Sequence, residues 1–356
     1  MSSVAILGYG RFGAALASLL EEAGHAVRAW DPAPAADGRA LAETMEQAAA
    51  GAEFVVLSVP MERVGAVARR LAPGLTASQV VVDVCSVKVY PSQALEAALS
   101  TPWVATHPLF GPASIARGER PLRVVVCPSG TFSAEEAAVR TLFAGIGCQV
   151  LTMDAHDHDR RMAESHALGF FLARGLLDAG ASFDSPVTPP SSLGIARTIA
   201  SVRSDAGHLL GALHGENPYA AEMRGRVIAS LTALDVALEA ETEQRRSGGD
   251  VDLGEGSLRI PDLGSRSPAL REIRELIDEL DGELLGLLAR RAVLSRRARA
   301  AKADLGAGVR DPRREAQLRG DRRARADEHG LDADAVDDVF AAILRLSVAL
   351  QEREGM

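Results

Sequence analysis

The first 150 residues alternate short apolar runs with stretches of helical spacing. Apolar runs rich in β-branched residues lie at 3–7, 25–30, 54–59, 80–85, 123–128 and 148–153. Between them, stretches such as residues 61–72 repeat apolar positions every three or four residues. Short apolar runs separated by turn residues predict buried strands, and the longer spacing predicts helices. The alternation therefore predicts a parallel, doubly wound α/β sheet of the Rossmann type up to about residue 153.

The strand pattern stops after residue 153, and helical spacing dominates from there on. Residues 245–268 are rich in Gly, Ser and Asp and contain two prolines, a composition typical of a linker. Residues 270–302 then keep helical spacing over an unusual length, and two shorter helices are expected near 313–328 and 334–352. The predicted organisation is a nucleotide-binding domain (1–153), an all-α substrate and dimerisation domain (154–244), a linker (245–268) and a C-terminal all-α domain (269–356).

Composition narrows the classes of function. The hydrophobic fraction is 47%, which is enough for buried cores. A formal net charge of −9 argues against nucleic acid as a partner. Three cysteines without metal-type spacing indicate a reducing compartment. The N-terminus lacks the basic region of a signal peptide, and no apolar run reaches the roughly 18 residues of a membrane span. We therefore expect a soluble, cytoplasmic protein with no membrane partner and no metal.

A glycine-rich turn joins the first expected strand to the first helix. Gly8 would make the tight turn, Gly10 would let a pyrophosphate approach, and Gly13 would allow close packing of helix and strand. The intervening Arg11 and Phe12 open the helix, whose N-terminus favours phosphate. Asp31 ends the second strand, where a carboxylate accepts a ribose hydroxyl and repels a 2′-phosphate. NAD is the expected cofactor, although Arg28 nearby leaves NADP open.

Two further segments lie where strands of such a sheet end. Residues 83–88 (DVCSVK) and 106–112 (THPLFGP) each follow a strand-like run, and ligands bind at the carboxyl ends of strands in this architecture. His107 there could take a proton from a substrate hydroxyl as hydride leaves. Ser86 on the neighbouring loop could orient the imidazole. A loop histidine with a purely structural role remains an alternative for His107.

These segments together with HDRRMAESHAL resemble the prephenate and arogenate dehydrogenase family over residues 3–240. The resemblance implies a Rossmann domain, a helical dimerisation domain and oxidative decarboxylation of prephenate to 4-hydroxyphenylpyruvate. His107 would accept the 4-hydroxyl proton, and Ser86 would hydrogen-bond both His107 and that hydroxyl. His158 would contact substrate or join the domains, and Asp159 and His166 lie on the same expected helix.

The substrate clamp departs from the family pattern. The family holds the ring carboxylate with an arginine of the second domain, and the spacing in residues 192–220 is altered. Arg197 is the first candidate and Arg203 the second, while a further family arginine is replaced by Ala212. Arogenate or 4-amino-4-deoxyprephenate would use the same chemistry, so the choice among these substrates stays open.

The C-terminal helices carry cations on the face that should be core. Arg274, Arg291 and Lys302 recur among its apolar positions. Unpaired cations inside a helical bundle are costly, so a small dicarboxylate is the expected ligand. One long helix with two short ones buries its own apolar stripe poorly, which predicts pairing with a second copy of the chain.

Residues 270–351 resemble the all-helical class of chorismate mutases, through LREIRELIDELDGELLGLLARR, Lys302, VRDPRREAQL and SVALQ. The resemblance implies that the substrate carboxylates are bound by arginines and a serine. Two residues would hydrogen-bond the ether oxygen and two would hold the ring hydroxyl. These sets are Arg274, Arg291, Arg314 and Ser347; Lys302 and Gln351; and Glu315 and Asp311. Arg274 would come from the partner copy.

The sequence thus predicts a bifunctional homodimeric enzyme of tyrosine biosynthesis, which converts chorismate to prephenate and oxidises prephenate with NAD. One alternative runs both reactions on 4-amino-4-deoxychorismate and its product. A second makes the C-terminal helices a non-catalytic dimerisation or regulatory module. A third is a different Rossmann oxidoreductase, such as a hydroxyacid dehydrogenase.

Overall fold

The computed structural model describes residues 1–116, 118–183, 185, 187–189, 192–204, 208–246, 268–304 and 312–353. Within these ranges, the side chains at 116, 193, 197, 201, 204, 208, 244–245, 268–276, 278–279, 297, 300–304, 312–315 and 348–353 are outside the description. The chain forms two compact units. The first comprises Met1–Pro112 and Leu122–Leu263, and the second comprises Ala113–Pro121 and Gly264–Met356.

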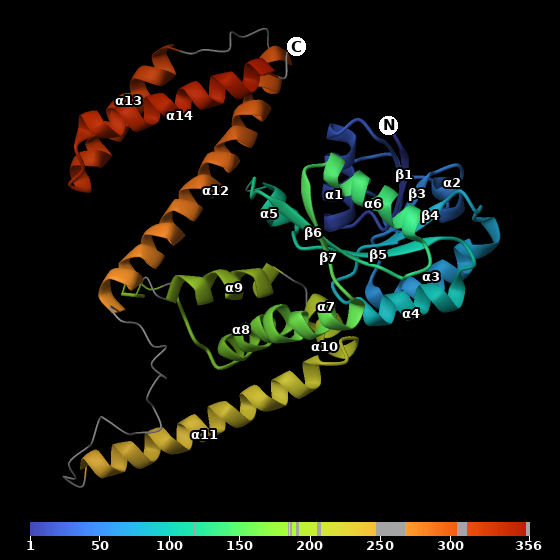
Figure 1. Cartoon of the computed structure of the whole chain (residues 1–356), viewed down its shortest axis with the longest axis horizontal. Helices are drawn as coiled ribbons and strands as arrows, with labels where there is room; N and C mark the ends of the chain where they lie inside the picture. Colours follow the sequence, from blue (N-terminus) through green and yellow to red (C-terminus); the bar gives the residue numbers. More distant parts are fainter. Residues whose placement is uncertain are drawn as a thin grey trace. The chain divides into compact units, whose positions relative to one another are not determined.

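A sheet of seven strands in the order β2-β1-β3-β4-β5-β6-β7 forms the centre of the first unit. Strands β1, β3 and β4 are almost entirely buried, which explains why they read as continuous apolar runs. Figure 1 shows α1 and α6 on one face of the sheet and α3 and α4 on the other. The strands are β1 (Ser3–Leu7), β2 (Ala26–Trp30), β3 (Phe54–Leu57), β4 (Val80–Asp83), β5 (Trp103–Pro108), β6 (Leu122–Cys127) and β7 (Cys148–Thr152).

The predicted α/β class is confirmed, with one difference in strand direction. Strand β6 runs antiparallel to β5, whereas the other neighbouring strands are parallel. The described part of the β5–β6 connection contains a single helix, α5, of five residues. A parallel neighbour requires a longer crossover, usually a full helix, so the chain returns in the opposite direction.

The helices of the first unit begin and end close to where spacing and capping residues predict. Helix α1 buries Leu16, Leu19 and Leu20 on one stripe against the sheet. Asp154 caps α7 by accepting the backbone N–H groups of His156 and Asp157. The helices up to residue 246 are α1 (Arg11–Glu22), α2 (Met45–Ala49), α3 (Val64–Leu71), α4 (Val89–Ala98), α5 (Pro112–Ala116, which belongs to the second unit from Ala113), α6 (Ser133–Gly145), α7 (Ala155–Met162), α8 (Leu168–Asp178), α9 (Leu193–Ser204), α10 (His208–Gly215) and α11 (Ala220–Arg246).

The C-terminal part of the second unit is helical, as predicted. It contains the long helix α12 (Pro268–Asp304), α13 (Pro312–Glu328) and α14 (Ala333–Arg353). Helices α13 and α14 are joined by ion pairs from Arg319 and Arg323 to Asp337, at 2.9 and 2.7 Å. Many apolar side chains of α12 are exposed, among them Ile277, Leu280, Leu284, Leu285, Leu287 and Leu294.

Candidate functional site

The glycine turn lies at the switch point of the sheet, where β1 has β2 on one side and β3 on the other. Gly8 has φ 97°, and a Cβ there would lie 2.2 Å from the carbonyl oxygen of Ser58. A Cβ on Gly13 would lie 2.0 Å from the carbonyl oxygen of Gly8. Both positions therefore require glycine for the close packing of strand, turn and helix.

Gly10 differs from these two, because a Cβ on it would meet nothing within 4 Å. The protein's own packing does not explain a glycine at this position. Gly10 is the N-cap of α1, so the open space lies beside the backbone N–H groups of the helix N-terminus. A phosphate could approach the backbone there, and the turn therefore fits a dinucleotide.

Asp31 follows β2 and is fixed next to this turn. Its carboxylate accepts the backbone N–H of Tyr9 at 2.7 Å and that of Ala33 at 2.8 Å. The side chain is only partly buried, so it remains accessible to a ligand. The neighbouring guanidinium groups are already engaged: Arg28 donates to the carbonyl of Ala50, and Arg39 pairs with Glu21 at 2.6 Å.

Phe12 connects the glycine turn to the second sequence motif. Its ring lies 6.0 Å from that of Phe110, centroid to centroid. Phe110 follows β5 within the HPLFGP segment that also contains His107. Arg11 opens α1 and is exposed. The turn and the candidate catalytic strand therefore meet at one edge of the sheet.

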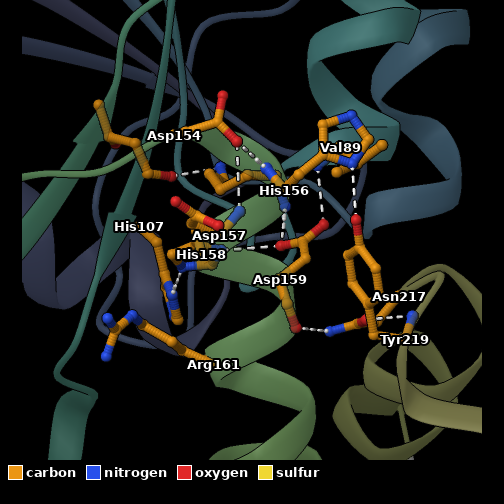
Figure 2. A network of polar contacts seen from close by, with 12 residues as sticks. Val89, His107, Asp154, His156, Asp157, His158, Asp159, Arg161, Asn217 and Tyr219 are labelled. Carbon is orange, nitrogen blue, oxygen red and sulfur yellow. Dashed lines mark hydrogen bonds and ion pairs between the residues drawn. The ribbon is translucent and has the colours of Figure 1, made fainter. Parts of the chain in front are cut away.

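A buried line of hydrogen bonds ends at His107 (Figure 2). His107 Nδ1 lies 2.9 Å from His158 Nε2, and His158 Nδ1 lies 2.8 Å from a carboxylate oxygen of Asp159. His107 is 4% exposed, and the other two are fully buried. We call His107, His158 and Asp159 the histidine relay.

The Asp159 carboxylate also holds the start of helix α4. It accepts the backbone N–H of Lys88 at 2.7 Å and that of Val89 at 2.8 Å. Asn217 donates to the backbone carbonyl of Asp159 at 2.7 Å. The contacts described for the Asp159 carboxylate oxygens all come from nitrogen atoms, so the carboxylate accepts each of these hydrogen bonds. His158 must therefore carry its proton at Nδ1.

The proton on Nδ1 of His158, beside Asp159, fixes the other proton positions along the relay. A proton at Nδ1 of His158 leaves its Nε2 as an acceptor, so neutral His107 donates from Nδ1. Nε2 of His107 is then a free lone pair on the far side of the ring.

The lone pair of His107 Nε2 stays unprotonated because His107 is buried. Burial lowers the pKa of His107 well below 6.5, and the neighbouring His158, Lys88 and His166 lower it further. Burial also lowers the pKa of His158. His107 is therefore a neutral base at physiological pH.

Lys88 lies beside the relay and is completely buried. Its ammonium donates to the carboxylate of Asp83 at the end of β4 and to the backbone carbonyl of Thr106 on β5. Thr106 in turn donates its hydroxyl to the carbonyl of Asp83 at 2.7 Å. This ion pair fastens the ends of β4 and β5 together, immediately before His107.

His166 lies on a π-helical turn, Ala163–Ala167, between α7 and α8. Its ring stacks on that of His107 at 6.4 Å and 10°, and the ring of Phe170 meets it edge-on at 4.9 Å. π-Helical turns are frequent at functional sites because they redirect side chains within a helix. The sequence marks His166 but not the irregular turn that places it.

The other predicted dehydrogenase residues lie as follows. Ser86 is partly buried on the loop after β4, and in the described chain no hydrogen bond joins it to His107, whose Nδ1 is taken by His158. Both ring nitrogens of His158 are engaged within the protein. Arg203 is exposed on α9, and the side chain of Arg197 lies outside the described residues.

In the second unit, Arg291 on α12 donates to the hydroxyl of Ser347 on α14. Burial lowers the pKa of Arg291, and the charge of Arg322 lowers it further. Arg322 lies over the ring of Phe340, 4.3 Å from its centroid. Among the described residues, no carboxylate pairs with Arg291. The arrangement therefore presents a partly buried positive charge that suits an anion.

The remaining residues predicted for this site lie outside the description. Asp311 is not described, and neither are the side chains of Arg274, Lys302, Arg314, Glu315 and Gln351. The described residues contain no group of His, Cys, Asp and Glu arranged to hold a metal ion. None of the described helices is long and apolar enough to cross a membrane.

Two family models match the sequence. Residues 24–152 match the nucleotide-binding domain of prephenate dehydrogenase, and residues 273–352 match chorismate mutase type II. The first match begins after the glycine turn. The two matches therefore cover strands β2 to β7 of the first unit, without β1, and most of the three C-terminal helices of the second.

The sequence relatives agree with the two models. A chorismate mutase of Methanocaldococcus jannaschii is 33% identical over 84 residues, which are 24% of this chain and 85% of the relative. T-proteins of Haemophilus influenzae and Enterobacter agglomerans are 29% and 31% identical over 175 and 171 residues. These are 49% and 47% of this chain, which covers only 44% and 42% of the T-proteins.

Solved structures share the fold. A prephenate dehydrogenase from A. aeolicus, in complex with hydroxyphenyl propionate and NAD+, aligns with a TM-score of 0.55 at 19% identity, covering 79% of this chain and 98% of that one. An arogenate dehydrogenase from Synechocystis aligns with a TM-score of 0.51 at 18% identity, covering 68% and 93%. Through residues 273–352 the chain belongs to the chorismate mutase family, and residues 24–152 match the model of the prephenate dehydrogenase nucleotide-binding domain.

Proposed function

We propose that this chain is a bifunctional enzyme that converts chorismate to prephenate and oxidatively decarboxylates prephenate with NAD, in tyrosine biosynthesis. The observation that carries the proposal is the neutral, buried His107 next to a dinucleotide turn, in a chain that also contains a chorismate mutase domain. The product of the mutase would be the substrate of the dehydrogenase. We assign the oxidation to residues 1–244 and the rearrangement to residues 269–356.

In the oxidation, the histidine relay supplies the base. Nε2 of His107 accepts the proton of the 4-hydroxyl, and the resulting imidazolium is stabilised through His158 by the Asp159 carboxylate. NAD, when bound, supplies the hydride acceptor. Loss of carbon dioxide makes the ring aromatic, so the protein mainly positions the substrate and polarises its hydroxyl. His158 then acts as a positioning residue, and Ser86 remains a candidate second partner for the hydroxyl.

Asp31 favours NAD over NADP in this proposal. Its carboxylate is oriented by the amides of Tyr9 and Ala33 and is accessible beside the glycine turn. A 2′-phosphate there would meet this negative charge. Arg28 and Arg39 already have partners within the protein, the carbonyl of Ala50 and the carboxylate of Glu21.

Arg291 and Ser347 would contribute to a carboxylate cage in the mutase site. Arg274, Arg314, Lys302, Gln351, Glu315 and Asp311 complete the proposed site. The rearrangement is pericyclic and transfers no proton, so fixed charges and a compact substrate conformation account for the acceleration. The exposed apolar side chains of α12 support pairing with a second copy of the chain, and we propose a homodimer.

The low pKa of His107 predicts how the oxidation depends on pH. Burial disfavours the imidazolium, so the ring stays a free base as the pH falls through 6.5, the ordinary value for histidine. The acid limb of kcat/KM for prephenate should therefore lie below pH 6.5. Measurement of NADH formation from pH 5 to 8 at low prephenate tests this, and an acid limb at or above 6.5 would contradict it.

Arg291→Ala should lower mutase turnover by about 10²- to 10³-fold, because a preorganised positive charge is removed from the site. Oxidation of added prephenate should not change. Arg345→Ala on α14 serves as a control that removes an arginine from the same bundle. Chorismate consumption followed by absorbance measures the effect, and a mutase rate within threefold of the wild type would argue against a role for Arg291 in catalysis.

The proposal as a whole is tested by the product that the full chain makes from chorismate and NAD, identified by mass and absorbance. We expect 4-hydroxyphenylpyruvate with stoichiometric NADH, and slower reaction with NADP. Prephenate, arogenate and 4-amino-4-deoxyprephenate should be compared as separate substrates. NADH formed only with an amino substrate would move both steps to the amino series, and unchanged chorismate would refute the two-step assignment.

A further inference from the structure

Arg161 lies on the same face of α7 as the histidine relay. It follows His158 by three residues, and residues at this spacing are neighbours on a helix surface. Because His158 Nε2 is 2.9 Å from His107 Nδ1, this face of α7 is the one turned toward His107. Figure 2 shows the guanidinium of Arg161 extending on the His107 side of the helix.

This guanidinium has no acidic partner among the described residues. The carboxylates at helical spacing from Arg161 are Asp157, which pairs with Arg160 at 2.6 Å, and the exposed Glu164, which forms no ion pair with it among the described side chains. Asp159, two residues from Arg161, is fully buried and bound to Lys88, Val89 and His158. Arg161 itself is exposed and enters no ion pair with the described side chains.

Its sequence neighbour behaves differently. Arg160 pairs with Asp157 at 2.6 Å and lies over the ring of Tyr219, 4.9 Å from its centroid. Of these two adjacent arginines, Arg160 therefore has a carboxylate partner and a ring partner among the described residues, and Arg161 has no carboxylate partner there.

We propose that Arg161 binds a carboxylate of the dehydrogenase substrate, beside His107. A planar guanidinium can hold a carboxylate through two parallel hydrogen bonds, and a dianionic substrate would supply the charge that the protein leaves unmatched. Arg161 thereby selects acids over neutral cyclic alcohols. The inference rests on the proposed oxidation and adds a residue to it that the sequence motifs do not mark.

The test compares Arg161→Gln with Arg160→Gln in the full chain, with prephenate varied at saturating NAD. A hydrogen bond to a charged group is worth about 1.5–3 kcal/mol, so KM for prephenate should rise about 10- to 100-fold in Arg161→Gln. Arg160→Gln should leave KM within twofold of the wild type. KM for NAD and mutase turnover should stay unchanged in both variants, which also reports on folding.

Arg161→Lys keeps the charge without the planar fork, so its KM should lie between those of Arg161→Gln and the wild type. An active wild type with an unchanged KM in Arg161→Gln would overturn the inference alone. An equal rise of KM in Arg160→Gln would also overturn it, because the effect would then come from net charge on the helix. A wild type that does not oxidise prephenate would refute the proposed function, and this inference with it.

Discussion

His107→Asn is expected to lower dehydrogenase kcat by about 10²- to 10⁴-fold and to leave mutase turnover unchanged. Asparagine can still donate a hydrogen bond to Nε2 of His158, so the buried relay keeps a partner. It cannot accept a proton at pH 7, which removes the base while preserving the local packing. Stopped-flow or steady-state NADH formation from prephenate measures the loss.

His156→Asn is the matched control for this variant. His156 is exposed on α7, where its Nδ1 lies 2.9 Å from the hydroxyl of Tyr219, outside the relay. Its substitution should not change the oxidation rate. If His107→Asn lost both activities equally, separate sites for the two reactions would be refuted. If it retained full oxidation, the base would have to be another group.

Lys88→Met should destabilise the chain by about 3–5 kcal/mol, because it leaves the carboxylate of Asp83 buried without its counter-charge. Methionine nearly matches the volume of the lysine side chain, so the loss of charge dominates over a cavity. The melting temperature should fall on the order of 10 °C. Thermal unfolding followed by circular dichroism provides the measurement.

Neutralising the partner separates charge from packing. Asp83→Asn in the Lys88→Met background removes the uncompensated charge and keeps an acceptor for the backbone N–H of Cys85, which lies 2.8 Å from Asp83 Oδ1. The double variant should recover a substantial part of the lost stability. A single variant as stable as the wild type would show that the pair does not hold β4 and β5 together.

Local patterns predicted the features that depend on neighbouring residues. Gly8 and Gly13 lie within one strand–turn–helix segment, and their spacing predicts the turn from that segment alone, although Gly8 also packs against Ser58 after β3. The spacing of residues 270–302 predicted α12, because helical periodicity is a property of the segment alone. Strand direction is different: an apolar run does not encode whether its neighbour is parallel, so the antiparallel β6 was not predicted.

The sequence patterns did not predict contacts between residues that lie far apart in the chain. His107 and His158 are 51 residues apart, and nothing in either motif states that their rings meet. Lysine is almost never fully buried, so Lys88 would be taken for a surface residue by composition alone. Arg161 was not among the predicted residues, because the family resemblance places the carboxylate-binding arginine in the segment that contains Arg197 and Arg203. Its unpaired charge is visible only in three dimensions.

The hydrogen bonds from the backbone N–H groups at the start of α4 to Asp159 limit the motions of α7 that could admit a substrate. Moving α7 away from the sheet would break the contacts of Asp159 with Lys88 and Val89 and that of His158 with His107 together. Several hydrogen bonds therefore hold α7 to the sheet and to the start of α4 at the same time. A hinge motion that moved α7 away from the sheet would break the hydrogen bond between His158 and His107 each time a substrate molecule entered. Substrate entry and product release that leave α7 in place would keep these hydrogen bonds, and with them the base, intact between turnovers.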